Sequence, residues 1–437
     1  MICLATVKML QLKCPRCARL DNGQGQVNTR NLFVNAVSCK AGGGVNDLAH
    51  TLPLLGATLN ERNWHLRTWV VEPGWQALEA AGYDMSRVEL VDAATPVKRA
   101  AWEFVRFPRL ARRRKPDVVF HFSNFIFRRL NVPQITVLRS PTFFSEQYAR
   151  RRRTGLYQKF RYWAGGRLSD TTIHRADRVF CISETHRQDI LRTVGPRGEK
   201  VEVSYLGFKG PGERQKVGRG DQGAILAQLP HEPRALLAPL RDPKRKIVLN
   251  VAHYYEHKNL GDLLEATQIL RKEFPEIAIV MTAGLTGYRG PRNARTELDT
   301  QLARRLAEEG ILFDVGPVPK DWVWPLLGLA DVFAFPSSLE SFGHPLLEAM
   351  SMQVPVVAAD TPIHREIAAD AAGYHEVGSP ESLAAQLGDV LNGQGDPSKA
   401  IERGLARVRD FTWEKHAEAL CVAIQEASRN TAAVARY

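Results

Sequence analysis

Residues Val332–Ala359, VFAFPSSLESFGHPLLEAMSMQVPVVAA, join two short apolar runs through a polar loop and one amphipathic segment. The runs at 332–337 and 354–360 are apolar except for the serine that ends the first and the aspartate that ends the second, and they are short enough to be buried β-strands. Pro345 suits the first residue of the helix between them, where its missing N–H costs nothing. A strand, a helix and a second strand in this order predict a parallel sheet covered by helices.

The same alternation extends over most of the chain and predicts an α/β fold. The β-rich runs lie at 31–37, 65–72, 88–93, 117–122, 134–140, 178–183, 200–206, 246–252, 277–284, 312–318, 332–337, 354–360 and 372–377. We expect an irregular extension at 1–28, a first α/β domain at 29–208, a linker rich in Gly, Pro and charge at 209–244, a second α/β domain at 245–410 and a final helix at 411–437. Ligands of such sheets bind beyond the carboxyl ends of the strands, so two facing sheets predict a cleft between the domains.

The composition indicates a globular protein, and its charge indicates acidic partners. Of 437 residues 44% are hydrophobic and 24% charged, and the net charge is +12. Arginine and lysine dominate 106–115, and 150–153 are all arginine. These runs are either solvated faces or a site that attaches the protein to an anionic membrane surface. The second interpretation rests on Trp102, Phe104 and Phe107, which interleave with the first run. Nucleic acid is not expected, since no zinc-finger spacing or RNP-like stretch is present.

The cysteines and the start of the chain give weaker signals. Cys14 and Cys17 form a C-x-x-C without a second pair that could complete a four-ligand zinc site, so we expect no metal and no cofactor. The opening MICLATVKMLQLK is a poor signal peptide, and no apolar stretch reaches the roughly 20 residues of a membrane-spanning helix. A cytoplasmic protein, with peripheral attachment to the inner face of the cell membrane, is therefore expected.

Two glutamates flank the loop of the opening stretch. Glu340 lies at the exit of the first strand and Glu348 near the end of the first turn of the following helix. Backbone N–H groups from Phe342 to Leu346 would form an anion site at the helix start. Since carboxylates accept hydrogen bonds from sugar hydroxyls, one ligand with hydroxyls on both sides of a diphosphate fits, namely a nucleotide sugar. The alternative is a capped helix with an acidic first turn.

Two further strand exits carry candidate residues. Gly42, Gly43 and Gly44 follow the first strand and open a helix, where glycine lets backbone amides approach a phosphate or a sugar. A plain strand-to-helix turn explains them as well. Lys258 follows the first strand of the second domain and could reach a diphosphate as a point charge, or it could be an exposed surface lysine.

Together these residues resemble the family-4 glycosyltransferases, retaining enzymes with two facing Rossmann-like domains (the GT-B fold). The resemblance runs from about Asn31 to the end of the chain. It is most specific from Val332 to Glu366, which follows the family's order of strand, E-x7-E, helix and G-x-PVVA. The terminal FTWEKHAEAL resembles the family's last helix, which returns to the first domain.

The resemblance assigns roles to individual residues. It places Glu340 on the donor sugar, Glu348 on the ribose, and the amides of Phe342 and Gly343, beside His344, on the diphosphate. Lys258 matches the phosphate lysine, and Gly43 and Gly44 match the first glycine loop.

Three departures from the family pattern stand out. Ala252-His253 replaces the usual Gly-Arg, which puts less charge beside the diphosphate. Gln353 replaces a common glycine, a change that we expect to be tolerated. Many members of the family have a histidine that contacts the donor sugar, and this chain has Phe120 at that position. His121, one place later, is therefore only a candidate for this role.

The function implied is a metal-independent retaining transfer of a sugar from a nucleotide-diphosphate sugar to a glycan or lipid-linked acceptor, in cell-surface polysaccharide or glycolipid synthesis. The sequence contains no Asp-x-Asp motif, so backbone amides, the helix dipole and Lys258 would meet the charge on the leaving diphosphate. The alternatives are a nucleotide-sugar epimerase or a phosphorylase of similar architecture, and a non-catalytic, basic surface-binding protein on this scaffold.

Overall fold

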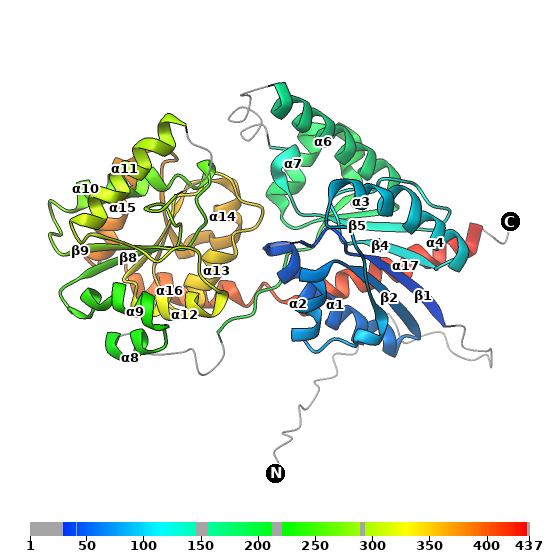
Figure 1. The fold of residues 1–437 in the computed structure, drawn as a ribbon, viewed down its shortest axis with the longest axis horizontal. Coiled ribbons are helices and arrows are strands. Elements are labelled where there is room, and N and C mark those ends of the chain that lie inside the picture. Colours follow the sequence, from blue (N-terminus) through cyan, green and yellow to red (C-terminus); the bar gives the residue numbers. More distant parts are fainter. Residues whose placement is uncertain (1–28, 41, 146–155, 212–220, 289–292, 435–437) are drawn as a thin grey trace, which may run out of the picture.

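The computed structural model describes residues 29–40, 42–145, 156–211, 221–288 and 293–434, and within them it contains two parallel sheets in two lobes (Figure 1). Each sheet is built from the apolar runs recognised in the sequence. The predicted α/β fold with two Rossmann-like domains is confirmed. Cys14, Cys17 and the arginines at 150–153 lie outside the described residues.

The first sheet has seven strands in the order β3-β2-β1-β4-β5-β6-β7, and every neighbouring pair is parallel. Its strands are β1 Arg30–Asn35, β2 Trp64–Val70, β3 Val88–Leu90, β4 Val118–His121, β5 Gln134–Leu138, β6 Arg178–Cys181 and β7 Val201–Val203. Its helices are α1 Gly43–Glu61, α2 Glu72–Ala80, α3 Pro96–Ala101, α4 Phe107–Arg114, α6 Leu156–Arg175 and α7 Glu184–Val194.

The second sheet has six parallel strands in the order β10-β9-β8-β11-β12-β13. They are β8 Lys246–Asn250, β9 Ile277–Met281, β10 Leu312–Asp314, β11 Val332–Phe335, β12 Val356–Ala359 and β13 Ala372–His375. The helices are α8 Gln222–Ala227, α9 His231–Leu236, α10 Leu260–Leu270, α11 Ala294–Glu308, α12 Lys320–Leu329, α13 His344–Ser351, α14 Pro362–Ala368, α15 Pro380–Leu391 and α16 Pro397–Val408, followed by α17 Trp413–Val434.

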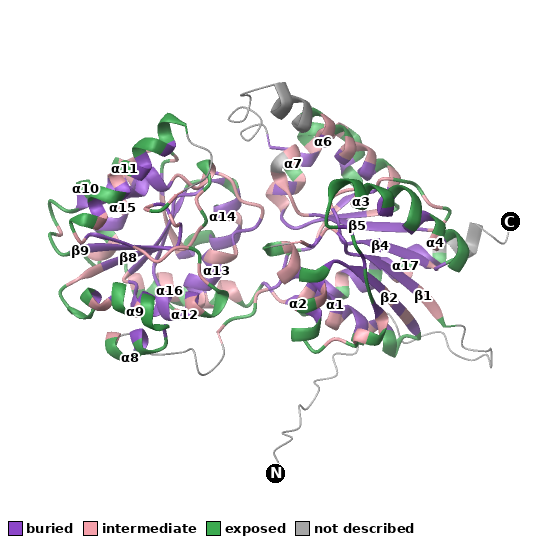
Figure 2. Cartoon of the chain, viewed as in Figure 1, coloured by how far each residue is buried: buried purple, intermediate pink, exposed green. Residues whose placement is uncertain are grey.

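Burial on both faces explains why the central strands are almost continuously apolar. Every residue of β4, β5, β9, β11 and β12 is buried. Figure 2 shows the strands in purple, while the helices expose green outer faces. Such strands occur where helices cover both sides of a parallel sheet, so the loops at the carboxyl edges are left to form the site.

The last helix, α17, lies against α1 of the first domain. Arg62 donates to Glu418 at 3.1 Å, and Ser204 hydrogen bonds to His416 Nδ1 at 2.7 Å. Figure 1 shows α17 in red beside the first sheet, far from the second sheet that precedes it in sequence. The chain therefore crosses between the domains twice.

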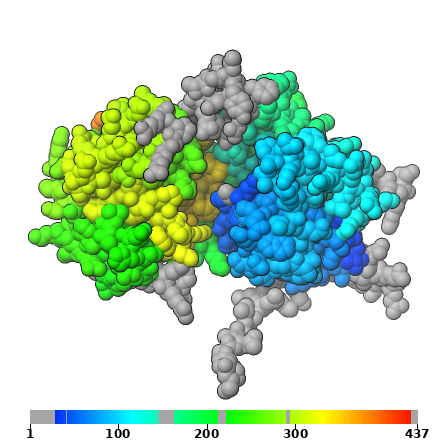
Figure 3. Space-filling model, viewed as in Figure 1, coloured from blue at the N-terminus to red at the C-terminus, as the bar shows by residue number. Residues whose placement is uncertain are grey.

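The interface between the domains uses a charged helix cap. The Glu366 carboxylate, from α14 of the second domain, accepts hydrogen bonds from the amides of Glu184 (2.6 Å) and Thr185 (2.7 Å) at the start of α7. Negative charge is favourable there because the first amides of a helix have no partner within it. The space-filling view shows the two domains as separate lobes (Figure 3), so such local contacts fix how they face each other.

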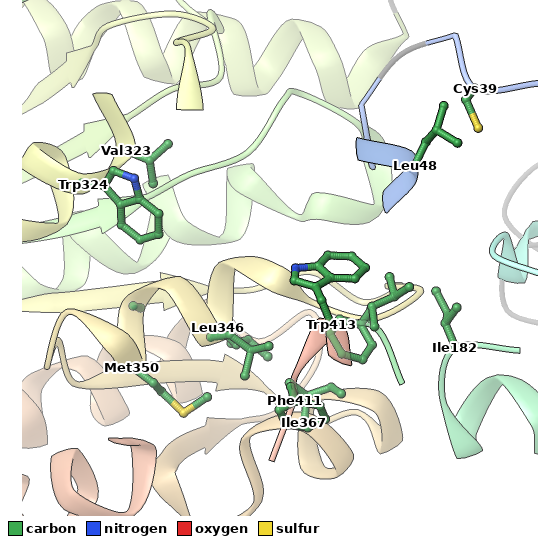
Figure 4. Close-up of a cluster of buried hydrophobic side chains, with 14 of the residues drawn as sticks. Cys39, Leu48, Ile182, Val323, Trp324, Leu346, Met350, Ile367, Phe411 and Trp413 are labelled. Atoms are coloured by element: carbon green, nitrogen blue, oxygen red, sulfur yellow. The ribbon is translucent and has the colours of Figure 1, made fainter. Parts of the chain in front are cut away.

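A hydrophobic cluster continues the contact across the domain junction. Figure 4 places Phe411 and Trp413, from the crossing segment, beside Leu346 and Ile367 of the second domain. Phe411 also packs edge-on against Phe342, with ring centroids 5.5 Å apart. The start of α13 is thus fixed to the segment that returns to the first domain.

The segment 209–244, expected as a linker, contains regular structure in its described part. Helices α8 and α9 lie within it, and α8 packs on α12. Ile225, Leu226, Leu229, Leu237 and Leu240 are fully buried in the core. These five apolar residues, spaced for short helices, outweigh the Gly, Pro and charge that suggested a linker, so 222–241 are part of the second domain. The other domain limits remain predictions.

The aromatic residues beside the basic run at 106–115 do not all face the solvent, as the proposed membrane-binding segment would require. Trp102 and Phe107 are buried with Trp69 in the core, and of the three aromatic residues only Phe104 is exposed, at 47%. Exposed Val97 and Val105 lie on the same α3–α4 segment. Separately, no helix in the described residues is both long and apolar enough to cross a membrane.

The junction makes a sharp stability prediction at Gly207. A Cβ at this position would overlap the backbone N and Cα of Trp413, and neither atom can move without shifting α17. We expect Gly207→Ala to lower the free energy of unfolding by about 1–3 kcal/mol or more, measured by urea titration with circular dichroism. The control is Gly210→Ala, whose Cβ would have its nearest contact at 3.5 Å. Equal stability of the two variants would contradict this packing.

Candidate active site

A cavity of about 610 Å³ lies between the domains, at the carboxyl ends of both sheets. The first domain lines it with Ser38, Cys39, Gly43, Gly44, Asp47, Arg99, Phe122, Ser123, Asn124, Phe125, Arg139, Ser140, Pro141, Ile182 and Leu206, and the second with Glu340, Ser341, Phe342, Gly343, His344 and Pro345. The volume lies within the range of small-molecule sites. The structure therefore brings the glycine loop and the 340–345 loop, which are almost 300 residues apart, into one cavity.

The glycine loop leads from β1 into α1. Gly42 adopts a φ of 58°, which favours glycine, and precedes the first turn of the helix. Gly43 and Gly44 have no positive φ, and a Cβ on Gly43 would meet no atom within 4 Å. Neither the backbone conformation nor the packing inside the protein requires glycine at position 43. Because Gly43 lines the cavity, a larger side chain there would take up space that a ligand could fill.

Lys258 and Glu340 form a nearly buried ion pair, with side chains 16% and 13% exposed. They follow the neighbouring strands β8 and β11, and Lys258 Nζ donates a hydrogen bond to Glu340 Oε1. Burial alone would raise the pKa of Glu340, but the charge and hydrogen bond of Lys258 hold it below its usual value. Glu340 is therefore an ionised hydrogen-bond acceptor on the cavity wall.

The loop into α13 presents backbone amides. Gly343 has a φ of 96° at the position before the helix, and Phe342 is buried. Pro345 has no N–H, and Leu346 donates its own to the Gly343 carbonyl, so the expected row of amides from Phe342 to Leu346 is shorter than the sequence suggested. Within the described part of the chain no acceptor is recorded for the amides of Gly343 and His344.

The His344 side chain belongs to the domain junction. Its Nε2 lies 3.1 Å from the carbonyl oxygen of Gly207, so this nitrogen carries the proton and donates. Burial lowers the pKa of His344 to about 4, which keeps the ring neutral. The ring packs against Phe342 and Trp413. The imidazole thus positions the start of α13, and only the backbone of His344 is left for a ligand.

Four predicted residues, Lys258, Glu348, His253 and His121, do not line the cavity. Glu348 is buried on α13, where burial raises its pKa, and Lys320 Nζ lies 3.9 Å from its Oε1. His253 is exposed in the loop after β8.

His121 is placed wrongly for a catalytic residue. It is buried on β4 between Phe107 and Gln134, with its Nε2 3.0 Å from the Gln134 side chain. Burial lowers its pKa to about 4. The next residue, Phe122, is the one that lines the cavity.

The sequence reasoning missed the polar wall of the first domain. Arg139 follows β5 directly, and Asp47 lies in the second turn of α1. Asn124 Oδ1 accepts hydrogen bonds from the amides of Arg139 (2.6 Å) and Ser140 (3.1 Å). Position directly after a strand is the signal that could have identified Arg139. Among the described residues no group of three or more His, Cys, Asp or Glu side chains could hold a metal ion.

Two family models match the chain and between them cover most of it. Residues 54–209 match Glycosyltransferase Family 4, and residues 238–407 match Glycosyl transferases group 1. Two facing parallel-sheet domains with the site between them define the class, a GT-B glycosyltransferase. The chain belongs to the family-4-like glycosyltransferases.

Similar curated proteins are glycosyltransferases as well. The O-antigen chain mannosyltransferase B of Escherichia coli is 24% identical over 322 residues, which is 72% of this chain and 74% of that protein. A D-inositol 3-phosphate glycosyltransferase of Salinispora tropica is 31% identical over 254 residues, 56% of this chain and 50% of that protein. The matched region thus spans between half and three quarters of these two relatives.

Solved structures share the fold at low identity. Anabaena HepE in complex with UDP superposes with a TM-score of 0.64 at 17% identity, covering 91% of this chain and 100% of that one. WaaG, a glycosyltransferase involved in lipopolysaccharide biosynthesis, gives 0.61 at 16% identity, covering 90% and 99%. At this identity the likeness establishes the fold.

The buried pair generates a stability prediction. Lys258→Met leaves Glu340 buried without a counter-ion, and we expect it to lower the free energy of unfolding by about 3–5 kcal/mol in urea titrations. The double variant Lys258→Met/Glu340→Gln removes both charges and should recover much of this loss. Lys399→Met, at an exposed pair with Asp396, is the control and should change little. A single variant as stable as the control would show that the pair contributes nothing.

Proposed function

We propose that the protein is a retaining glycosyltransferase that takes its sugar from a nucleoside-diphosphate sugar bound in the cavity between the domains. The observation that supports this most is the meeting of an ionised carboxylate, Glu340, with the Gly343 and His344 amides and the Gly43 loop in one cavity. The amides and the α13 dipole suit a diphosphate, and Glu340 suits the sugar hydroxyls. HepE was crystallised with UDP and with UDP-glucose, which favours a similar donor here.

The transfer needs a stabilised leaving group. The acceptor oxygen forms a bond to the anomeric carbon on the face from which the diphosphate leaves, the bond to the diphosphate oxygen breaks, and the hydroxyl proton passes to the departing diphosphate. Lys258 and the amides at the start of α13 would meet the charge that develops there. Glu348 on α13 is assigned to the ribose, and His253, after β8, would add a neutral donor near the phosphates. Retention follows from the family resemblance.

The acceptor is proposed to be a glycan or a lipid-linked sugar in polysaccharide or glycolipid synthesis. A mannosyltransferase of O-antigen chains and an enzyme of lipopolysaccharide synthesis are among the similar proteins. An epimerase or a phosphorylase on the same fold is the alternative. If the protein is a glycosyltransferase, we expect addition of an acceptor to accelerate consumption of the donor.

Donor binding is tested with Gly43→Leu. A Cβ at this position would meet no atom within 4 Å, and Gly43 lines the cavity, so we expect the fold to persist and nucleotide-sugar affinity to fall at least tenfold in isothermal titration calorimetry. Glu348→Gln should also weaken binding about tenfold, because a hydrogen bond to a charged carboxylate is replaced by a weaker one to a neutral amide oxygen. The ligands are a panel of UDP, GDP, ADP and their glucose and mannose derivatives.

The matched controls are Gly166→Leu, at another glycine with free space beside it, and Glu381→Gln, in the first turn of α15. Both should bind like the wild type. If no nucleotide or nucleotide sugar of the panel binds the wild-type protein, the proposed function is wrong.

We also propose that the α3–α4 face contacts an anionic membrane surface. Exposed Val97, Phe104 and Val105 lie on the same α3–α4 segment as the exposed arginines 112–114, and exposed apolar side chains interleaved with basic ones suit an anionic interface. On this proposal the protein would attach to the inner face of the cell membrane, where lipid-linked acceptors would be within reach.

Vesicle co-sedimentation tests this surface. Arg112→Gln and Arg113→Gln should each weaken binding to vesicles of phosphatidylglycerol and phosphatidylcholine about fivefold, and salt should weaken it further. The control, Arg304→Gln on α11, changes the net charge equally but lies in the other domain. If all three variants lost vesicle binding equally, the binding would depend on net charge alone, and the proposed membrane surface would be wrong.

A further inference from the structure

The first-domain wall of the cavity carries charged side chains that the proposed donor does not use. They are Arg99 on α3, Asp47 on α1 and Arg139 directly after β5. The donor groups assigned above lie mainly on the second domain. These three residues therefore face the part of the cavity that remains for the acceptor.

Arg139 is held in place while part of its hydrogen-bonding capacity is unused. Its guanidinium carbon lies 3.5 Å from the centroid of the Phe122 ring, and Asn124 fixes its backbone amide. The side chain is 13% exposed, and in the described structure Nε and Nη2 are buried without a hydrogen-bond partner. A planar guanidinium fixed by stacking is prearranged to bind an oxyanion through two donors.

Asp47 lies close to Arg139 but does not accept a hydrogen bond from its unused donors. Its Oδ2 lies 3.4 Å from Arg139 Nε, and its side chain is 3% exposed. Its Oδ1 has no hydrogen-bond partner among the described residues. Burial raises the pKa of Asp47 to about 6, although Arg139 and Lys320 lower it. Each buried unsatisfied polar group costs about 1–3 kcal/mol, so a pair that served the fold alone would be expected to close.

Arg99 adds a second guanidinium, whose Nε is buried and has no hydrogen-bond partner in the described part of the chain. Its charged neighbours are Lys40 and Glu103. Lys40 Nζ donates to the carbonyls of Ala93 (2.7 Å) and Ala94 (3.1 Å), and Glu103 accepts from Asn35 at 2.9 Å. Burial raises the pKa of Glu103 to about 7, so at neutral pH it offsets only part of the charge. This wall is therefore net positive.

We propose that Arg99, Arg139 and Asp47 form the acceptor subsite, in which the two arginines bind a phosphate or carboxylate of the acceptor and Asp47 accepts a hydrogen bond from one of its hydroxyls. The inference rests on the proposed function, because it takes the cavity as the site of sugar transfer. It narrows the acceptor to a hydroxylated molecule with an anionic group near the reacting hydroxyl. A neutral glycan end leaves both arginines unpaired.

The test is binding of glycerol phosphate, with glycerol as the neutral comparison, to protein saturated with the nucleoside diphosphate that binds best. The nucleotide occupies the donor positions, so calorimetry then reports the second anion site. We expect glycerol phosphate to bind and glycerol not to bind. Arg139→Gln and Arg99→Gln should each weaken glycerol phosphate binding at least tenfold. Asp47→Asn should reduce the preference for glycerol phosphate over inorganic phosphate.

Two further variants separate recognition from structure. Arg139→Lys retains the charge and loses the planar pair of donors, so it should fold as the wild type and bind glycerol phosphate at least fivefold less tightly. Arg197→Gln, on the surface of the same domain, should leave binding unchanged. Equal binding in all variants, or no binding of glycerol phosphate to the saturated wild type, would overturn the subsite. Loss of nucleotide affinity in Arg139→Gln would also overturn it, by assigning the arginine to the donor.

Failure of the proposed function gives a different pattern. If no nucleotide binds, glycerol phosphate is titrated into the free protein, with Lys258→Met beside the arginine variants. Loss of binding in the arginine variants alone supports an anion site on this wall despite the failed donor assignment. Loss in Lys258→Met alone places the anion on the second domain and contradicts the proposal.

Discussion

Parallel pairing is the constraint on which the rest of the structure depends. Within each described sheet every strand runs in the same direction as its neighbours, so all carboxyl ends share one edge. The cavity residues follow from this: the glycine loop leaves β1, Arg139 leaves β5 and Glu340 follows β11. Lys258 follows the neighbouring strand β8 and reaches the cavity wall through its ion pair with Glu340. Each edge alone presents only half of the polar groups. The site therefore depends on how the two edges face each other.

The facing of the two edges is fixed by contacts to backbone groups. Glu366 caps α7, and His344 donates to the Gly207 carbonyl. These contacts depend on main-chain positions, which packed helices hold rigidly. Since His344 also begins α13, the amides offered to a ligand and the contact that joins the domains belong to the same turn. A shift between the domains therefore acts directly on the geometry of the anion site.

The sequence could predict the strands, their parallel arrangement and the loops that carry Glu340, Gly343 and Lys258, because apolar runs and strand exits are local signals. It could not predict that Lys258 pairs with Glu340, which lies 82 residues away and comes close through the pairing of β8 with β11. His121 failed for a related reason. Side chains alternate along a strand, and which of two neighbours faces the cavity depends on packing on both sides of the sheet.

The buried pair gives the proposed donor site its selectivity. A free nucleoside diphosphate offers oxyanions to Lys258 but no hydroxyl donors to Glu340, so drawing the lysine away would leave a buried carboxylate unpaired, a loss of about 3–5 kcal/mol. A nucleotide sugar offers both: its hydroxyls can satisfy Glu340 while its phosphates engage Lys258. On the proposed donor binding, the exchange of one buried pair for two sets of ligand contacts would favour the intact donor over the free nucleoside diphosphate. In the proposed reaction, closing the pair again after the sugar has left would displace the nucleotide, so the interaction that stabilises the fold without ligand would also promote release of the product.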